Sequence, residues 1–409
     1  MALKFNFDSE LCVRCKGKGY CGKPCPILSK FSSSMPKPKT HFSGSSPPEI
    51  FVGRYGYPQV NTGILSPEEY GNTEKYSMPE LWHKNNFSIE KILSLRGKLI
   101  YSKFKSHLKS RQGNKFLSLM QEISLAYKPV SVEIFLKSPP KQNFSIDMHL
   151  PIIGNPAPLK YARLEENPQV KSKVEYLTSD TDIKASSALK ELYKGSIEIS
   201  NIIKILSAGL LGKKTSRKLV PSRWSITAVD DTLSKYLLEK IRLYPEISEI
   251  LVFTSEYLGN HYEFLLLPDK FSFEVIEAKL TGSVWNPQGP LYLAQDYESF
   301  NGRKDYAENV TGAYYSNRLA LAEYLEKIKK QASCLVMREC RPEYYAPCGV
   351  GILREASRQA FKEKPEVFSD LNSAFNSIQS RLRLSSSVFM ENSWLLKEYK
   401  TQTRLNKWA

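Results

Sequence analysis

Four cysteines near the start of the chain form the sharpest chemical pattern in the sequence. They follow the spacing Cys12-x2-Cys15-x5-Cys21-x3-Cys25. Tetrahedral Zn²⁺ takes four thiolate or imidazole ligands, and two close cysteine pairs can supply them from two short turns. The tight backbone of such turns is permitted by three glycines, Gly17, Gly19 and Gly22. The spacing predicts a zinc site. An iron–sulfur cluster, which also uses four thiolates, stays open as the alternative.

Three further cysteines, Cys334, Cys340 and Cys348, lack any paired spacing. Free cysteine behaves as a small apolar residue and is often buried. We therefore expect these three thiols to lie in the core and to take no part in metal binding.

A second pattern lies at the other end of the chain, in Gln402–Ala409 (QTRLNKWA). It resembles the peptide by which DNA-processing proteins bind the PCNA sliding clamp. Leu405 and Trp408 lie on one side of a helical turn and suit an apolar pocket, while the Gln402 amide can anchor the peptide by hydrogen bonds. The peptide departs from the usual pattern at Ala409, where a second aromatic residue normally stands. The alternative is a terminal helix whose Trp408 packs against its own domain.

Arginine and aromatic residues gather in three further segments. Arginine binds phosphate in a fixed geometry, and aromatic rings stack on bases. If these segments converge, they predict a binding site for a nucleotide or a single strand of DNA. The alternative is that the rings are core residues and that each arginine pairs with a carboxylate such as Glu298 or Glu323. The residues concerned are Arg54, Tyr55 and Tyr57; Arg223, Trp224 and Ser225; and Arg303, Tyr314, Tyr315 and Arg318.

A catalytic interpretation rests on His261-Tyr262-Glu263. The period of two in a strand places His261 and Glu263 on one face. Enzymes that transfer ADP-ribose need a polar residue for the ribose, an aromatic ring and a glutamate, and this tripeptide has those types. Such enzymes usually spread them over separate strands, whereas here they are contiguous. His261 and Glu263 are therefore the candidate catalytic pair of a nucleotide-dependent transferase, with the enzymatic interpretation left open.

Two other reaction classes are disfavoured because their sequence motifs are absent. The chain contains no Walker phosphate-binding loop and no His-x-x-x-His zinc-protease pair, which argues against an ATPase and a metalloprotease.

These side chains must be positioned by helices and strands, several of which have clear periods. Runs rich in β-branched and aromatic residues predict strands at 130–137 and 250–254, and a pair of neighbouring strands at 261–267 and 271–280. Asp230 and Asp231 are expected to open a helix that presents Leu233, Leu237 and Ile241 on one face. Apolar residues at helical spacing predict a second helix over 314–332. This mixture predicts an α+β fold.

Composition limits the partners. The chain has 409 residues, of which 41% are hydrophobic, and a formal net charge of +16, so it can form a sizeable core and attracts polyanions such as nucleic acid. No apolar run approaches the ~20 residues of a membrane span, and the start lacks the apolar stretch of a signal peptide. We therefore expect a cytoplasmic, nucleoid-associated protein without a membrane partner. The oligomeric state stays open.

Four longer stretches are similar to the archaeal NreA family of DNA-repair proteins. They are Gly44–Pro67, Leu219–Asp231, Asn301–Glu323 and Tyr344–Ala360. The four-cysteine start and the C-terminal peptide also fit that family, so the resemblance covers essentially the whole chain. It implies a role in DNA repair alongside PCNA, but it does not supply a reaction.

The sequence therefore predicts four parts. Residues 1–28 form a four-cysteine metal module, 29–48 a Ser/Pro/Lys-rich linker or arm, 49–400 a globular α+β body and 401–409 a clamp-binding peptide. A subdomain boundary is expected near 139–168, where prolines interrupt the body. The leading hypothesis is a DNA-repair factor that binds nucleic acid and is recruited by PCNA. The alternatives are a transferase that takes a nucleotide ligand and transfers ADP-ribose to DNA ends or to protein, and a non-catalytic repair adaptor.

Overall fold

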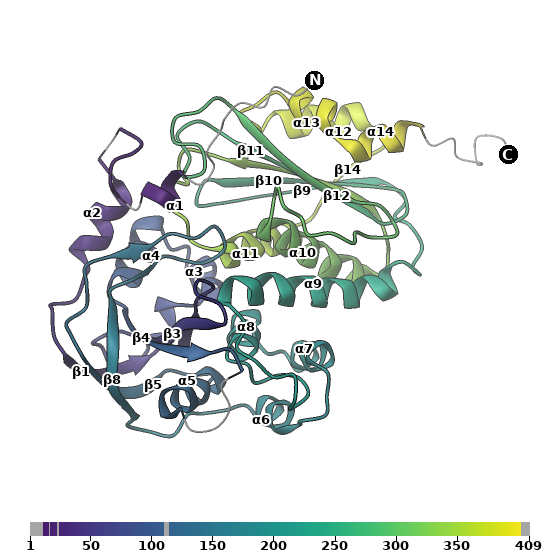
Figure 1. The fold of residues 1–409 in the computed structure, drawn as a ribbon. Coiled ribbons are helices and arrows are strands. Elements are labelled where there is room, and N and C mark those ends of the chain that lie inside the picture. Colours follow the sequence, from purple (N-terminus) through teal and green to yellow (C-terminus); the bar gives the residue numbers. More distant parts are fainter. Residues whose placement is uncertain (1–10, 16, 23, 110–113, 402–409) are drawn as a thin grey trace. The chain divides into compact units, whose positions relative to one another are not determined.

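The computed structural model describes residues 11–15, 17–22, 24–109 and 114–401, and Figure 1 shows the order of the elements along the chain. These residues form two compact units. The N-terminal unit contains Cys12–Leu233 and Ala346–Ile352, and the C-terminal unit contains Ser234–Tyr345 and the described residues from Leu353 onward. The division falls inside two helices, α9 (Ser222–Ile241) and α11 (Val350–Ala360). Helices and sheets occur together in both units, which confirms the α+β class.

The N-terminal unit is built on a six-stranded sheet with the order β1-β5-β8-β4-β3-β2. Only β4 and β8 pair in parallel, and the other neighbours are antiparallel. The strands are β1 (His41–Ser46), β2 (Glu49–Val52), β3 (Gln59–Ser66), β4 (Ile100–His107), β5 (Val130–Leu136) and β8 (Pro156–Leu164).

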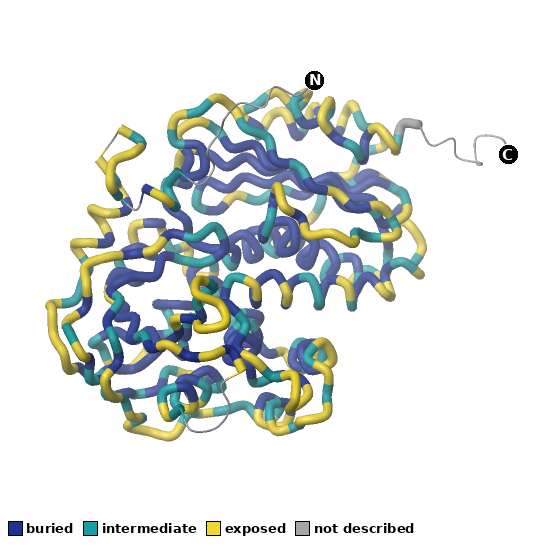
Figure 2. The backbone as a smooth tube through the Cα atoms, viewed as in Figure 1, coloured by how far each residue is buried: buried dark blue, intermediate teal, exposed yellow. Residues whose placement is uncertain are grey.

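Alternating side chains give this sheet two different faces. In β5, Val132, Ile134 and Leu136 are buried, and they pack in one apolar cluster with residues of α5 (Lys115–Leu125) such as Met120. The intervening side chains of the same strand are only partly buried. A strand with a period of two places these two sets on opposite faces. One face of the sheet therefore packs in the core; Figure 2 marks the buried residues along the strands in dark blue.

Shorter elements complete the N-terminal unit. The turn η1 (Glu74–Tyr76) and α4 (Ile89–Gly97) contribute to a second apolar cluster, in which Leu95 packs with Leu65 and Tyr101 of the sheet. The other elements are α1 (Leu11–Cys15), α2 (Pro26–Ser33), α3 (Pro79–Lys84), β6 (Phe144–Ser145), β7 (Ile153–Gly154), α6 (Ser172–Ser179), α7 (Ala185–Lys194) and α8 (Ile199–Ser207).

The C-terminal unit has its own six-stranded sheet with the order β12-β11-β13-β10-β9-β14. Here β11 and β13 pair in parallel, and the other neighbours are antiparallel. The strands are β9 (Ile250–Tyr257), β10 (Asn260–Leu267), β11 (Ser272–Lys279), β12 (Tyr292–Glu298), β13 (Ser333–Cys340) and β14 (Glu366–Phe368).

Helices cover both faces of this second sheet, as Figure 1 shows. On one face, α12 (Leu371–Gln379), α13 (Ser386–Asn392) and α14 (Trp394–Thr401) close an apolar cluster that contains Leu265 and Met337. On the other face, Tyr314 of α10 (Gly312–Ile328) meets the Phe273 ring, with the ring centres 5.1 Å apart. A sheet covered on both sides explains why β10 and β13 are buried along their whole length.

The structure corrects two expectations about these elements. The strands predicted at 261–267 and 271–280 do form, but they are not neighbours, because β13 lies between β10 and β11. Helix α9 begins at Ser222, eight positions before Asp230, so the two aspartates lie inside the helix and do not open it. The strands at 130 and 250 and the helix that contains Tyr314 are confirmed within a few residues.

Two boundaries also differ from the expectation. The segment 29–48 contains the end of α2 and all of β1, a strand fully paired with β5, so it is not an irregular linker. The two units divide at Leu233 and Ser234, and residues 139–168 all belong to the N-terminal unit. Within the described part of the chain, every helix is too short or too polar to cross a bilayer.

Candidate functional site

The loop between β2 and β3 carries the first aromatic-basic group. Tyr55 and Tyr57 are 76% and 58% exposed. The Arg54 guanidinium donates to the Tyr55 hydroxyl at 2.9 Å and lies 4.9 Å from the centre of that ring. Gly56 has φ 82°, and a Cβ there would lie 2.8 Å from the carbonyl oxygen of Gln59. The glycine thus permits a tight loop that presents one cation and two rings to solvent.

The start of α9 carries the second group. The main-chain N–H of Val52, at the end of β2, donates to Ser222 Oγ at 2.9 Å, which joins two sequence blocks 170 positions apart. Trp224 is 48% exposed. Ser225 is fully buried and its hydroxyl donates to the carbonyl of Val220 at 3.4 Å, so it serves the start of the helix and does not share the exposed surface.

The second group contacts a loop between β6 and β7 that sequence reasoning missed. Arg223 Nη1 donates to Asp147 Oδ2 at 3.1 Å. The other oxygen, Oδ1, accepts from the main-chain N–H of His149 at 2.8 Å and lies 3.7 Å from its Nδ1. Arg54 is close enough for its charge to act on the His149 imidazole. We call Arg54, Asp147, His149 and Arg223 the Asp147 cluster.

The charges of this cluster are set by its surroundings. Burial lowers the pKa of His149, and the positive charges of Arg223 and Arg54 oppose its protonation further, against the opposite effect of Asp147. Burial alone would raise the pKa of Asp147, but the His149 imidazole and Arg223 outweigh it and hold that pKa well below its usual range. At neutral pH the cluster therefore contains two cations, one anion and a neutral imidazole.

The Asp147 cluster thus keeps a net positive charge beside three exposed rings, those of Tyr55, Tyr57 and Trp224. Arginine favours phosphate and exposed rings stack on bases. This is an arrangement that suits a nucleotide or a nucleic-acid strand.

The third predicted group, in the C-terminal unit, is buried. Arg318 donates from Nη1 to both carboxylate oxygens of Glu298, at 3.1 and 2.9 Å, and from Nε to Ser234 Oγ at 3.1 Å. Its guanidinium lies 5.7 and 5.3 Å from the ring centres of Tyr314 and Tyr315. These two rings and the arginine are almost entirely inaccessible to solvent. We call Glu298, Tyr314, Tyr315 and Arg318 the Tyr314 cluster.

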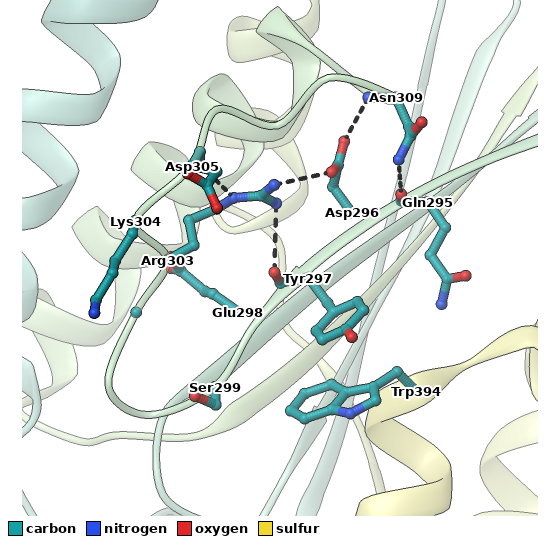
Figure 3. Close-up of a pocket in the computed structure, with 11 residues that line it drawn as sticks. Gln295, Asp296, Tyr297, Glu298, Ser299, Arg303, Lys304, Asp305, Asn309 and Trp394 are labelled. Carbon is teal, nitrogen blue, oxygen red and sulfur yellow. Dashed lines mark hydrogen bonds and ion pairs between the residues drawn. The ribbon is translucent and has the colours of Figure 1, made fainter.

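Arg303 lies at the edge of this cluster and lines a hollow of ≈ 480 Å³. Four of its five N–H donors are used, by the Asp296 carboxylate and by three main-chain carbonyls. The opposite wall is the stacked pair Tyr297 and Trp394, whose ring centres are 4.5 Å apart (Figure 3). Arg303 therefore has little capacity left for a phosphate.

The candidate catalytic pair lies in an ion-pair network on β10. His261 Nε2 is 2.9 Å from Glu263 Oε1, as the strand period predicts for residues on one face. Arg381 donates to both oxygens of Glu263, at 2.8 and 3.0 Å. Burial lowers the pKa of His261, but Glu256 and Glu263 outweigh it, so the net shift is upward. Both Glu263 oxygens are thus committed to a buried ion pair, and the catalytic role stays a prediction.

Comparison with known proteins shows the family to which the chain belongs. The family description "Archaeal Nre, N-terminal" matches residues 20–286, and "Archaeal Nre, C-terminal" matches residues 298–408. The chain belongs to the archaeal Nre family. The two family segments divide between residues 286 and 298, whereas the compact units divide inside α9. No solved structure matches the chain.

Nre relatives of similar length carry the name of DNA-repair proteins. The chain is 37% identical over 393 residues to "DNA repair protein NreB" of Archaeoglobus fulgidus, covering 96% of this chain and 98% of the relative. It is 38% identical to "DNA repair protein NreA" of the same organism, covering 91% and 94%. It is 37% identical to "DNA repair protein NreA" of Haloferax volcanii, covering 80% of each chain.

In the cysteine segment of this Nre protein, two thiols accept hydrogen bonds from the main chain. The main-chain N–H of Tyr20 donates to Cys15 Sγ at 3.3 Å, and that of Leu28 donates to Cys25 Sγ at 3.4 Å. Burial, together with the nearby thiols of the other three cysteines, raises the pKa of Cys12 to about 12. Among the described residues, however, no group of three or more His, Cys, Asp or Glu is arranged to hold a metal ion. The metal therefore stays a prediction.

Two outcomes complete the comparison with the sequence. Cys334, Cys340 and Cys348 are buried free thiols, as expected. Gln402, Leu405 and Trp408 lie outside the described residues, so the clamp-binding peptide also stays a prediction. The residues that sequence reasoning missed are Asp147 and His149, for which the only available signal was an Asp-x-His spacing in a polar segment.

Proposed function

We propose that this Nre protein acts in DNA repair by binding nucleic acid at the Asp147 cluster, while its C-terminal peptide recruits it to the PCNA sliding clamp. The names of its relatives support the DNA-repair role. The net charge of +16 favours a polyanionic ligand.

One observation carries the nucleic-acid part of the proposal. Arg54 and Arg223, 169 positions apart in the sequence, both act on His149, and exposed rings flank each of them. Packing of the core does not require these rings, because they are largely in solvent. A phosphate held by the arginines would leave adjacent bases free to stack on Tyr55, Tyr57 or Trp224.

Binding of labelled DNA by an Arg54→Ala, Arg223→Ala double variant tests this site. Each lost phosphate contact should reduce the slope of log affinity against log salt by about 0.7 for a single strand. We expect affinity at low salt to fall at least tenfold, measured by fluorescence anisotropy over a salt series.

A matched control removes two positive charges elsewhere in the same unit. Lys173 and Lys194 both pair with Glu191 on the surface, at 3.1 and 2.8 Å. The Lys173→Ala, Lys194→Ala variant should bind almost as the parent does. If the arginine variant also bound with the parent's affinity and salt slope, the Asp147 cluster would not be the nucleic-acid site.

The clamp peptide is tested by deleting residues 402–409. The truncated chain should lose capture by immobilised PCNA, because Leu405 and Trp408 supply the apolar contacts. Its thermal unfolding should match that of the parent. Retention of clamp binding would remove the peptide from the proposal, and clamp binding without any DNA binding would favour the adaptor alternative.

We also propose that Cys12, Cys15, Cys21 and Cys25 bind a metal that holds this segment together. The hydrogen bonds to Cys15 and Cys25 support this, since backbone N–H groups stabilise thiolate ligands. Elemental analysis of the purified chain should find zinc or iron, with the content lost in Cys12→Ser, Cys25→Ser and retained in Cys334→Ser. Absence of both metals from the parent would refute the site.

A further inference from the structure

At β3 and β4 the second face of the N-terminal sheet packs in an apolar cluster through Leu65 and Tyr101, whereas at β1, β5 and β8 it carries partly exposed side chains. In β1, β5 and β8 the apolar side chains of Phe42, Ile134 and Leu159 belong to the apolar cluster of the core. Because strand residues alternate, the side chains of His41 and Phe135 point away from it. Figure 1 shows these three strands together at one side of the unit. Figure 2 shows teal and yellow segments along them. We call the side chains on this side the outer face.

Three rings form a row across the outer face. His41 of β1 is paired in register with Phe135 of β5, which is paired with Tyr161 of β8. The His41 and Phe135 rings are stacked at 4.2 Å and 10°, and the Phe135 and Tyr161 rings are 5.8 Å apart at 49°. Tyr161 is 50% exposed and His41 is also exposed. The row therefore offers aromatic surface to solvent.

Close to the row the exposed charged side chains are mainly basic, while the carboxylates of Glu165 and Glu166 lie further along, after β8, where they accept from Ser43 Oγ and from the Ser131 main-chain N–H. The carboxylate of Glu133, two positions before Phe135 on β5, lies 3.0 Å from His41 Nε2 and forms an ion pair with Arg163 at 2.6 Å. Three lysines surround the row without an ion pair to any acidic residue that the structure describes: Lys105 on β4, Lys137 after β5 and Lys160 on β8. All three are exposed.

The position of Lys160 next to Tyr161 has a structural cause. The register between β5 and β8 shifts between Phe135 and Leu136, where Tyr161 and Leu159 are the respective partners. Lys160 is the extra residue of this irregularity, and both it and Tyr161 are exposed. A β-bulge of this kind re-aims side chains at a sheet surface. A cation and a ring are thus presented side by side.

We propose that the outer face binds a single strand of nucleic acid, as a second surface separate from the Asp147 cluster. Unpaired bases can stack on the rings of His41, Phe135 and Tyr161, while the lysines contact the phosphates. Aromatic residues on a sheet surface, combined with a positively charged border, are the chemistry by which single strands are bound. A duplex keeps its bases stacked on one another, so it can use only the lysines.

The experiment titrates the full-length chain with a short single-stranded oligonucleotide of about eight bases, which is long enough for one surface. Calorimetry should give two oligonucleotides per parent chain. The variant Tyr161→Ala, and separately Lys105→Ala with Lys160→Ala, should leave one. The Arg54→Ala, Arg223→Ala variant should lose the other site and keep this one, so each failure is distinguishable.

Affinity for a longer single strand gives a second readout. Loss of one stacking ring should weaken binding roughly 5- to 150-fold. Tyr176→Ala is the matched control, because Tyr176 is also an exposed tyrosine of the N-terminal unit. Tyr161→Leu keeps an apolar side chain against Phe135 and removes only the ring's capacity for stacking. It should weaken single-strand binding to a similar extent while thermal unfolding stays unchanged.

Several results would overturn the proposal. Parent affinity and stoichiometry in both Tyr161→Leu and the lysine variant would show that the outer face takes no strand. An equal loss for duplex and single strand would show attraction of charge without stacking, which also contradicts it. DNA and RNA strands of one sequence serve as parallel probes. Equal effects on both would support recognition through bases and phosphates, and an effect on one alone would name the strand that is bound.

Discussion

The Asp147 cluster and the Tyr314 cluster contain the same kinds of residue in opposite environments. In the N-terminal unit, Arg223 pairs with Asp147 near the surface, and Trp224 beside it is half exposed. In the C-terminal unit, Arg318 pairs with Glu298 beneath two buried tyrosines. Arginine next to aromatic residues is thus compatible with a ligand surface and with a core.

The difference lies in how many donors remain available and in what covers the rings. An arginine enclosed by a carboxylate, a hydroxyl and two rings is a structural element, because no ligand can reach it without unfolding its surroundings. An arginine at the border of solvent can exchange or share its partner with a phosphate. The comparison therefore predicts that variants in one cluster change stability and variants in the other change binding.

The largest effect is expected from Glu298→Gln. This variant keeps the shape of the side chain but leaves the buried Arg318 guanidinium without a counter-charge, so the free energy of unfolding should fall by about 3–5 kcal/mol. Urea denaturation measures it. In Asp147→Asn the pair is partly hydrated, and the loss should be roughly 1–2 kcal/mol. Equal losses in the two variants would erase the distinction between the clusters.

Removing one aromatic side chain from each cluster tests the same difference between a buried and an exposed site. Tyr314→Ala removes a fully buried ring and should destabilise the chain by roughly 3–5 kcal/mol. Trp224→Ala should leave urea denaturation nearly unchanged and weaken single-strand binding by about 1–3 kcal/mol. A Trp224→Ala variant that unfolds easily but binds normally would assign Trp224 to the core.

The smallest effects concern two histidines with opposite shifts. In the folded chain the pKa of His261 is raised above 6.5, because Glu256 and Glu263 outweigh burial and Arg341. The pKa of His149 is lowered by burial and by Arg223 and Arg54, against Asp147. NMR titration of the imidazole protons should therefore give one resonance that titrates above pH 6.5 and one below it. The variants His261→Gln and His149→Gln assign them.

The shifts also predict opposite dependence of stability on pH. His261 binds its proton more tightly when folded, so its contribution is fully present below pH 6.5 and is lost as pH rises through its raised pKa. For His149 the unfolded state takes up the proton first, so stability falls as pH drops below 6.5 towards its lowered pKa. Replacing each histidine should remove the corresponding slope. If the two histidines changed the pH dependence of stability in the same direction, the environments assigned to His261 and His149 would be wrong.

The sequence predicted features that depend on neighbouring residues. It did not predict features that depend on contacts between residues far apart in the chain. Alternating residues indicate β5, and a run of aromatic and aliphatic residues indicates β10, so these strands were predictable. The shared face of His261 and Glu263 then follows from the period of a strand. The insertion of β13 between β10 and β11 was not, because strand order depends on a segment more than 50 residues away. The same limit hid Asp147, whose partner Arg223 is 76 positions distant.

By itself the sequence determined the family, the α+β class, the net charge and the residue types that can bind metal, phosphate and bases. Each of these depends on identity and spacing along the chain. Only the tertiary structure decided which arginines meet solvent and which are enclosed, and which rings share a face of a sheet. Burial is a property of all the elements that surround a side chain, and neighbouring residues in the sequence are only a few of them.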